Sequence, residues 1–572
     1  MKIIPAKTAG FCMGVRRAVE VALDAPLRYT PPIFTFGPLI HNPQVLDLLE
    51  EKDIRVMDEV PAQGHGTVII RAHGVPPEKK EQLTQAGYHV IDATCPRVIK
   101  VQRIIEKHAA RGYATIIIGD EEHPEVIGLR GYAGGKGYVA GSFRELDALE
   151  TFEKAVIVAQ TTQNIRFYEE IKRWVQQRHP HYRVFDTICD STEKRQDEVR
   201  RLAKEVDVFV VVGGFESGNT RRLAGIAKES GKPAFHVETE SDLNPVLFAN
   251  ARRVGLTAGA STPNWIIKRV YRALETMPRS LVKSSVFNIL RFLMLTNIYA
   301  AVGAGCLCFA ASKLQRITDS LTAVYVAVLY ILAMHTMNHL TGSKSDDYND
   351  PDRALYYKKY RFPLAVLAVI AGMLCFVVSF FHGLLPFLVI LVMSFMGFSY
   401  NIRLVPKPFT LGRYFRIRDI PGSKTIAIAM AWGIVTAIYP ILAVDAHYRG
   451  ATAIAFLWAT TMAFVRTAFS DIIDMQGDRI VGKETIPILM GEKKTMKMLK
   501  IVLAGAGGLL FAAAAFDRVT GLGFLLMICP ALMLVVLFAH ERGFLMPGIR
   551  LEFLIDTHFI LAGVLTYLWL IF

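Results

Sequence analysis

The chain has 572 residues, a formal net charge of +14 and a hydrophobic content of 52%. This length is too great for a single hydrophobic core, so we expect at least two domains. The positive charge alone would suit a nucleic-acid-binding protein, but the chain has no basic stripe interleaved with aromatic residues, which argues against nucleic acid as a partner.

The composition divides the chain into two parts. Residues 1–277 are charged and alternate short β-branched runs with helical stretches, which predicts a soluble α/β domain of parallel-sheet units. We expect residues 278–285 to be a linker and residues 286–572 to form an all-α membrane domain. No apolar segment precedes Cys12, so no secretory signal is expected and the first domain should be cytoplasmic. The odd number of cysteines, seven, also favours a reducing compartment over a disulfide framework.

Three cysteines of the first domain each lie between a strand-like run and a helical run. They are Cys12, Cys95 and Cys189. A cysteine at a helix start feels the positive end of the helix dipole, which lowers the pKa of its thiol and favours the thiolate that binds metal. The repetition suggests one shared metal centre. By spacing alone, three unrelated buried cysteines are the simpler interpretation, because no C-x-x-C pair is present, and a zinc site is a further alternative.

Polar residues follow six of the strand-like runs in the first domain. They are His41 with Asn42, His73, His123 with Glu125, Gln160 to Gln163, Ser217 to Asn219, and Ser261. In open parallel sheets, the carboxyl ends of the strands and the following helix N-termini form the ligand crevice. Histidines, hydroxyls and glycine-rich turns there suit a phosphate or diphosphate. Each residue alone is more often a turn or cap residue, but their repetition at one structural position favours a binding site.

In order along the chain, these motifs resemble the family of 4-hydroxy-3-methylbut-2-enyl diphosphate (HMBPP) reductase (LytB), the last enzyme of the methylerythritol phosphate pathway of isoprenoid biosynthesis. The resemblance covers roughly residues 1–277. The motifs that carry it are Phe11-Cys12 with Gly14-Val15, Gly37 to Pro43, Arg71 to Gly74, Asp92 to Pro96, His123 to Glu125, Gln160 to Thr162, Thr187 to Cys189 and Thr257 to Ser261.

This resemblance implies a trefoil of three parallel-sheet α/β units around a 4Fe-4S iron-sulfur cluster with Cys12, Cys95 and Cys189 as ligands. Two electrons, expected from reduced ferredoxin or flavodoxin, and two protons would remove the HMBPP hydroxyl as water and give isopentenyl and dimethylallyl diphosphate. Glu125 matches the catalytic acid that delivers the proton, and Thr161 matches the hydroxyl that relays or positions it. The substrate-binding positions are matched by His41, His73, His123, Thr161, Ser217, Gly218, Asn219 and Ser261. Gly218 stands where many members have a serine, so its contact would be a backbone one.

Nine apolar segments follow the linker, near residues 288–312, 317–340, 362–381, 384–400, 425–444, 451–469, 498–516, 519–539 and 553–572. Most are long enough to cross a hydrocarbon core of about 30 Å. The loops after the second, fourth, sixth and eighth segments hold most of the lysines and arginines, whereas the alternate loops hold only Lys313, Arg316, Arg449 and Arg518. This asymmetry follows the positive-inside rule and predicts a multi-pass protein of the inner (cytoplasmic) membrane, with its N-terminal domain in the cytoplasm.

An acidic cluster lies at the end of the sixth apolar segment. Asp471, Asp474 and Asp478 are spaced i, i+3 and i+7 and therefore share one helix face, where like charges repel unless a cation offsets them. Mg²⁺ is the expected ion, since it binds through one or two carboxylates plus substrate phosphate oxygens. The alternative is a solvated acidic cap at a membrane exit.

The second half resembles the UbiA superfamily of intramembrane prenyltransferases, and residues 471–478 match its second aspartate-rich motif. In the first motif, Asn338, Asp346, Asn349, Pro351 and Arg353 fall on pattern positions, whereas His339 and Gly342 stand where the family usually has aspartates. The resemblance implies Mg²⁺-dependent transfer of a prenyl group from a prenyl diphosphate to a lipophilic acceptor. Asp346 would be a further metal ligand, and Asn338, Lys483 and Arg403 would contact the diphosphate.

The sequence therefore predicts a fusion of a cytoplasmic iron-sulfur reductase with a membrane prenyltransferase. The alternative for the second half is an inactive anchor that only localises the reductase at the bilayer.

Overall fold

The computed structural model describes residues 1–277, 281–341, 345–399, 422–444, 450–481, 483–545 and 548–572. The chain divides into two compact units, Met1–Arg279 and Ser280–Phe572. Helix α11 (Leu281–Leu295) begins inside the expected linker.

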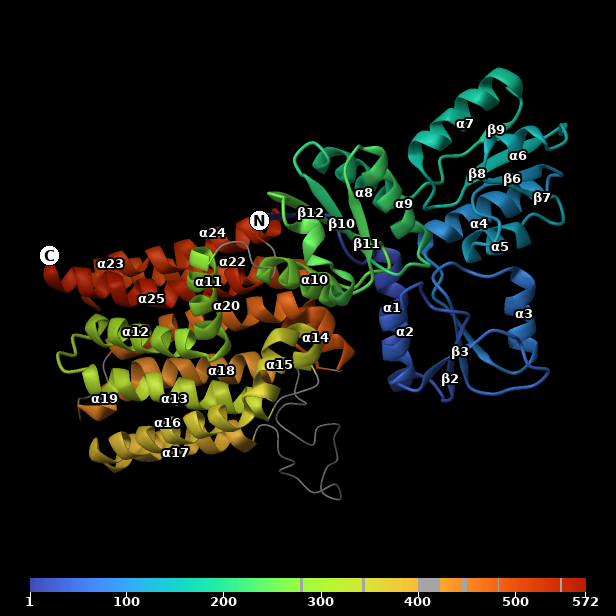
Figure 1. Ribbon diagram of the computed structural model, residues 1–572. Helices are drawn as coiled ribbons and strands as arrows, with labels where there is room; N and C mark the ends of the chain where they lie inside the picture. Colours follow the sequence, from blue (N-terminus) through green and yellow to red (C-terminus); the bar gives the residue numbers. More distant parts are fainter. Residues whose placement is uncertain (278–280, 342–344, 400–421, 445–449, 482, 546–547) are drawn as a thin grey trace. The chain divides into compact units, whose positions relative to one another are not determined.

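Three four-stranded sheets build the first unit (Figure 1), and every pair of neighbouring strands is parallel. The first sheet has the order β1 (Lys2–Pro5), β12 (Arg253–Ala258), β10 (Val208–Val212) and β11 (Ala234–Val237). The second has β3 (Ile54–Met57), β2 (Ile33–Phe36), β4 (Thr67–Ile70) and β5 (His89–Asp92). The third has β7 (Gly137–Ala140), β6 (Ala114–Ile118), β8 (Ala155–Ala159) and β9 (Arg183–Val184). The predicted parallel-sheet units are confirmed.

Central strands of these sheets are runs of mostly β-branched residues and alanine, with Phe209 in β10, that are buried along their whole length, as in β4, β6, β8 and β10. Such continuous apolar strands are typical of parallel sheets whose two faces are covered by helices. The helices are α1 (Met13–Arg28), α2 (Pro43–Glu50), α3 (Pro77–Gln85), α4 (Pro96–Ala109), α5 (Pro124–Gly131), α6 (Phe143–Asp147), α7 (Ile165–Arg178), α8 (Asp190–Leu202), α9 (Gly218–Glu229) and α10 (Asn264–Thr276), with short 3₁₀ turns η1 (Glu240–Asp242) and η2 (Pro245–Phe248).

Strand ends position the functional loops. Except at β3, which leads directly to β4, the chain leaves the carboxyl end of each strand and enters a helix, as β4 does at Ile70 and β8 at Ala159. In such sheets this edge is where ligands bind.

The second unit is helical. Its elements are α11, α12 (Ile298–Leu314), α13 (Leu321–Leu340), α14 (Ser345–Asn349), α15 (Pro351–Lys359), α16 (Arg361–Phe381), α17 (Leu384–Ser399), α18 (Ser423–Gly433), the π-helical turn η5 (Ile434–Ile438), α19 (Tyr439–Ala443), α20 (Gly450–Ile480), α21 (Ile486–Met490), α22 (Glu492–Ala515), α23 (Leu522–Leu526), α24 (Ile528–Glu541) and α25 (Ile549–Ile571).

Within the described residues, 7 helices are long and apolar enough to cross a membrane, or 8 if the pair Asn288–Leu295 and Ile298–Leu314, bent by 71°, forms one span. The apolar helix Leu384–Ser399 is shorter. Each of the nine expected apolar segments therefore coincides with a helix or helix pair, while the structure supports seven or eight full spans.

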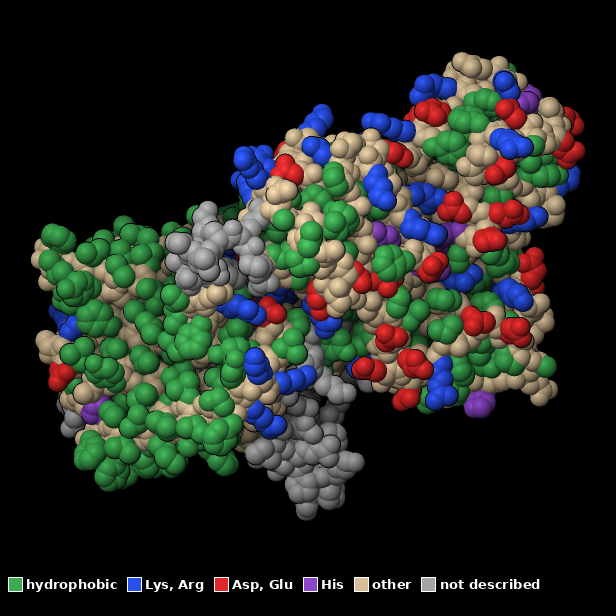
Figure 2. Space-filling view, viewed as in Figure 1, with side chains coloured by type: hydrophobic (Ala, Val, Ile, Leu, Met, Phe, Trp, Pro, Cys, Tyr) green, Lys and Arg blue, Asp and Glu red, His purple; other side chains and the backbone are tan. Residues whose placement is uncertain are grey.

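Apolar side chains predominate on the face of this helical unit that Figure 2 shows, with few charged side chains among them. Large examples are Phe381, 82% exposed, and Phe362, 79% exposed. A soluble protein rarely presents so large an apolar surface, because water penalises it, whereas lipid does not. The arrangement indicates a multi-pass membrane domain.

Candidate functional site

Each of the three predicted cysteines is the residue just before a helix, and each belongs to a different sheet. Cys12 caps α1 after β1, Cys95 precedes α4 after β5, and Cys189 precedes α8 after β9. All three are free thiols that line one cavity. Gly14 makes room for this convergence, because a Cβ there would lie 2.3 Å from Cys95 Sγ.

The three thiols line one cavity but are not grouped closely enough to form a single-ion site. Among the described residues, only a set of three histidines brings three ligand atoms within 4.8 Å of one another, and the cysteines do not form such a set. A single zinc ion binds each thiolate at about 2.3 Å, which would hold the sulfurs within about 4 Å. Three thiolates that share one cavity without meeting at one ion fit the donor set of an iron-sulfur cluster.

The expected lowering of the thiol pKa by the helix ends is wrong for Cys95 and Cys189. Burial raises the pKa of the Cys95 thiol, and hydrogen bonds from the backbone of Arg97 and Val98 offset only part of that rise. Burial likewise raises the pKa of Cys189, against smaller contributions from the backbone of Ser191 and Thr192. Desolvation outweighs the dipole here, so metal binding would itself have to displace the thiol protons.

Helix α8 holds the loop that carries Cys12. The Glu198 carboxylate accepts hydrogen bonds from Lys7 N at 2.8 Å, Thr8 N at 2.9 Å and Thr8 Oγ1 at 2.7 Å. One turn closer to Cys189, the buried Arg195 guanidinium donates to Gly10 O. The helix that begins at one thiol therefore fixes the loop of another, and no local pattern predicts this contact across about 190 residues.

Three histidines from two sheets meet beside the thiols. The ring centroids of His41 and His73 are 4.9 Å apart, and those of His73 and His123 are 5.3 Å apart. Buried polar atoms without a hydrogen-bond partner among the described residues face this region, namely His41 Nε2, His73 Nδ1 and Asn219 Nδ2. Buried polar groups are normally satisfied, so their grouping indicates a polar ligand.

The three imidazoles are neutral at pH 7. Burial, followed by the Arg71 charge, lowers the pKa of His41. Burial also lowers the pKa of His73, and it lowers that of His123 to about 4, with His41 as the next cause. His123 Nδ1 accepts from Glu125 N at 3.1 Å, which assigns its proton to Nε2. An anion bound in the pocket would raise the pKa of the imidazoles and so favour their protonation.

Glu125 is buried, with 2% exposure, and forms two hydrogen bonds with Thr161. Thr161 N donates to Oε1 at 2.6 Å and Thr161 Oγ1 donates to Oε2 at 2.8 Å. Burial raises the pKa of Glu125, against smaller opposing contributions from these bonds. The two residues thus form a coupled acid and hydroxyl on the wall of the cavity that also contains the thiols.

The remaining predicted residues of the first unit line the same cavity. Ser217 caps α9 and accepts from Thr220 N at 3.4 Å, and Ser261 Oγ donates to Ser217 Oγ at 3.2 Å. A Cβ added at Gly218 would lie 3.5 Å from the nearest atom of His123, so a side chain fits there. The structure brings together all twelve predicted residues of this unit: Cys12, His41, His73, Cys95, His123, Glu125, Thr161, Cys189, Ser217, Gly218, Asn219 and Ser261.

Sequence reasoning missed Arg222, which links two sheets beside the cavity. Its guanidinium donates to Asp120 Oδ2 at 2.6 Å and to Thr162 O at 3.2 Å. An arginine in the first turns of a helix has no distinctive pattern, so only the tertiary fold reveals this role.

In the membrane unit, four predicted carboxylates lie near one lysine. Asp471 and Asp478 are buried on α20, and the Lys424 ammonium interacts electrostatically with both, with Asp474 and with Asp346. Lys424 was not predicted, because a lysine at the start of an apolar segment looks like any positive-inside residue.

Contacts from other elements fix individual members of this acidic group. Thr425 Oγ1 donates to Asp471 Oδ2 at 2.5 Å, and Asn349 Nδ2 donates to Asp478 Oδ1 at 2.9 Å. Lys483 Nζ lies 3.4 Å from Asp478 Oδ1. Helix α14 therefore packs against α20 at the expected metal motif.

Other predicted residues are arranged differently. His339 Nδ1 lies 3.2 Å from Asp346 Oδ2, so the histidine at an expected aspartate position pairs with the next acid of the motif. Asn338 is exposed. Among the described residues, the carboxylates do not bring three ligand atoms within reach of one ion. Arg403 lies outside the described residues.

Comparisons with known proteins agree with this division. The family model described as LytB protein matches residues 3–275, and that of the UbiA prenyltransferase family matches residues 298–544. The 4-hydroxy-3-methylbut-2-enyl diphosphate reductase of Geobacter sulfurreducens is 42% identical over 275 residues, which cover 48% of this chain and 97% of the relative.

Two solved structures are also similar. The E-1-hydroxy-2-methyl-but-2-enyl-4-diphosphate reductase of Plasmodium falciparum has 28% identity and a TM-score of 0.47, covering 48% of this chain and 89% of its own. A UbiA homolog from Aeropyrum pernix has 13% identity and a TM-score of 0.36, covering 47% of this chain and 98% of its own. The chain thus belongs, through its first half, to the LytB family of reductases, and its second half matches the UbiA prenyltransferase family, which confirms the predicted fusion.

Proposed function

We propose that the first unit reduces HMBPP to isopentenyl and dimethylallyl diphosphate. The observation that carries this proposal is that three thiols, three histidines and the Glu125–Thr161 pair line one cavity. The relatives that share this half are named as reductases of that substrate.

The residues fit a 4Fe-4S cluster bound by Cys12, Cys95 and Cys189. When bound, such a cluster supplies electrons one at a time and, with three protein ligands for four irons, leaves one iron open to the substrate hydroxyl. The unpartnered polar atoms of His41, His73 and Asn219 would hold the diphosphate. Ser217, Gly218 and Ser261 would complete that pocket, with Gly218 contributing its backbone.

Proton delivery falls to Glu125. A proton donor must be protonated at working pH, and burial raises the pKa of this carboxyl in that direction. Thr161 Oγ1, 2.8 Å from Glu125 Oε2, would position the acid or relay its proton toward the leaving hydroxyl. Two protons and two electrons then release the oxygen as water.

Anaerobic turnover of HMBPP by the full chain with reduced methyl viologen tests this function. Glu125→Gln keeps the shape of the side chain but cannot supply the proton, so kcat should fall by at least about 100-fold. Glu121→Gln, at a nearby carboxylate whose side chain is 72% exposed, is the matched control and should keep the wild-type rate. Equal rates in both variants would reject Glu125 as the acid.

Metal content separates the reductase from a zinc-binding protein with the same thiols. Anaerobically purified protein should be brown, with broad absorption near about 400 nm from thiolate-to-iron charge transfer. A colourless, zinc-loaded protein would contradict the cluster.

For the second unit, we propose Mg²⁺-dependent transfer of a prenyl group from its diphosphate to a lipophilic acceptor. Support comes from the match to the UbiA family and from the acidic group around Lys424. Mg²⁺ bound by Asp471, Asp474, Asp478 or Asp346 would neutralise the substrate diphosphate, and Lys424 and Lys483 would stabilise it as it leaves. Asn338 and Arg403 remain proposed diphosphate contacts.

We further propose that the chain crosses the inner membrane nine times, with the reductase in the cytoplasm and a reduced ferredoxin or flavodoxin as its donor. Membranes containing the protein should transfer prenyl groups only with Mg²⁺. Asp474→Asn should abolish this transfer, whereas Asp517→Asn, at a residue with an 85% exposed side chain, should not. An inactive anchor, favoured by His339 and Gly342 in the first motif, predicts no transfer by any variant.

A further inference from the structure

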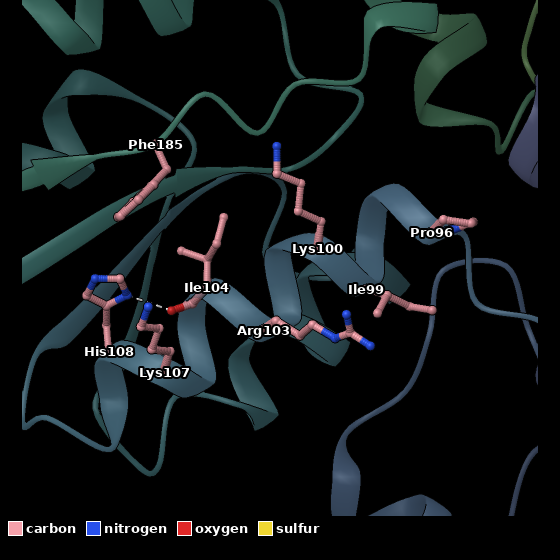
Figure 3. A pocket seen from close by; sticks show the side chains of 8 residues that line it. All are labelled: Pro96, Ile99, Lys100, Arg103, Ile104, Lys107, His108 and Phe185. Carbon is pink, nitrogen blue, oxygen red and sulfur yellow. Dashed lines mark hydrogen bonds between the residues drawn. The ribbon is translucent and has the colours of Figure 1, made fainter.

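A groove of about 510 Å³ runs along α4, outside the cavity that the three thiols share (Figure 3). Its inner wall is apolar, formed by the half-buried side chains of Ile99, Ile104 and Phe185. Its rim is basic, formed by the exposed side chains of Lys100, Arg103 and Lys107. An apolar centre within a charged rim is the usual anatomy of a protein-binding surface.

The three basic residues lie on one stripe of the helix. They are spaced i, i+3 and i+7, so their side chains project from the same face. None of them forms an ion pair with a described residue of the chain, in contrast to Arg97, which lies 2.5 Å from Asp190. The positive charge of this stripe is therefore available to a partner.

The groove also adjoins a proposed cluster ligand. Helix α4 starts directly after Cys95, and Pro96, its first residue, lines the groove. Lys100 is five residues from Cys95, which is about 7.5 Å along a helix axis. The N-terminal end of the groove therefore lies close to Cys95, which shortens the path for an electron delivered there.

We propose that this groove is the docking site for a small, acidic, one-electron carrier protein with an iron-sulfur or flavin centre. The proposal rests on the proposed reductase function, which needs two electrons from outside the first unit. Two reduced carriers would dock in turn and each give one electron, being oxidised themselves. The C–O bond of the substrate hydroxyl breaks, one proton leaves with that oxygen as water, and a second proton forms the new C–H bond of the product.

Charge complementarity favours this occupant. Carboxylates of the carrier would meet Lys100, Arg103 and Lys107, while the apolar patch around its redox centre would cover Ile99, Ile104 and Phe185. Rim charges of this kind act mainly on the association rate and make it depend on ionic strength.

The test uses the full chain in detergent and a variant with Lys100→Glu, Arg103→Glu and Lys107→Glu. The control variant carries Arg166→Glu, Arg173→Glu and Lys228→Glu, exposed residues of α7 and α9 that give the same change in net charge. HMBPP turnover is measured with a reduced acidic 4Fe-4S ferredoxin and, separately, with reduced methyl viologen. Binding of oxidised ferredoxin to each variant is measured without turnover.

At low ionic strength, the groove variant should lose at least about tenfold in kcat/KM for ferredoxin and in ferredoxin affinity. Its viologen-driven rate should match that of the wild type, and the control should keep both rates. Unchanged ferredoxin binding in the groove variant, or an equal loss in the control, overturns the docking site. Absence of viologen-driven turnover in the wild type would instead overturn the reductase, while the binding measurement still decides the groove.

Discussion

Glu198 provides a sharp test of how the fold positions Cys12. The carboxylate, 7% exposed, accepts from two backbone N–H groups and one hydroxyl of the loop before Cys12. In Glu198→Gln, the amide still accepts one backbone bond, but its NH₂ group faces the other N–H donor. Loss of one hydrogen bond to a charged acceptor costs about 1.5–3 kcal/mol. The loop from Lys7 to Cys12 should therefore open about ten to a hundred times more often.

Hydrogen–deuterium exchange of peptides that cover residues 6–12 measures this opening directly. Arg201 forms ion pairs with both Glu198 and the exposed Glu205. The control Glu205→Gln removes one of these charges without touching the loop, so hydrogen–deuterium exchange in the loop should stay unchanged. Iron content after anaerobic purification should fall in Glu198→Gln and not in Glu205→Gln. Exchange within twofold of wild type in a folded Glu198→Gln protein would refute the proposed restraint.

Other perturbations follow from the site and the membrane unit. Because burial raises the pKa of Glu125, the pH–rate profile of kcat should have an alkaline limb where this acid ionises. Thr161→Val removes a hydrogen bond that stabilises the ionised carboxylate, so it should move that limb to higher pH. The same variant should lower kcat about 100-fold. Gly218→Ser adds a hydroxyl where space exists and should lower the KM for HMBPP about tenfold; an unchanged KM would place the diphosphate elsewhere. Arg466→Met leaves the buried Asp556 without its ion-pair partner at 2.8 Å and should lower the free energy of unfolding by about 3–5 kcal/mol, measured by thermal unfolding. The double variant Arg466→Met with Asp556→Leu should recover most of that free energy.

The sequence predicted the first site well because its residues sit at one repeated local position. A parallel strand that ends at a polar loop, as at His73 or Thr161, needs no tertiary knowledge to be placed at the ligand edge. The contacts made by Glu198 and Arg222 could not be predicted, since they join residues far apart whose local patterns are ordinary. The sign of the thiol pKa shift was missed for a similar reason, because burial depends on the packed fold.

In the membrane unit, apolar length located the long apolar helices but not the short helices α14, α15 and α21, nor the number of full spans. The bend between Leu295 and Ile298 and the short helix Leu384–Ser399 depend on packing against neighbours, which hydropathy does not report. Lys424 was not predicted as a site residue, because the positive-inside rule already accounts for lysines and arginines at the ends of apolar segments.

One cysteine comes from each of the three sheets, and no sheet supplies two. An inorganic core shared by these thiols would cross-link the three sheet units, so its loss would remove a restraint from all three at once. Oxidative loss of such a core would therefore destabilise all three sheet units together. Proteolysis between these units should then increase as the absorption of the metal centre is lost.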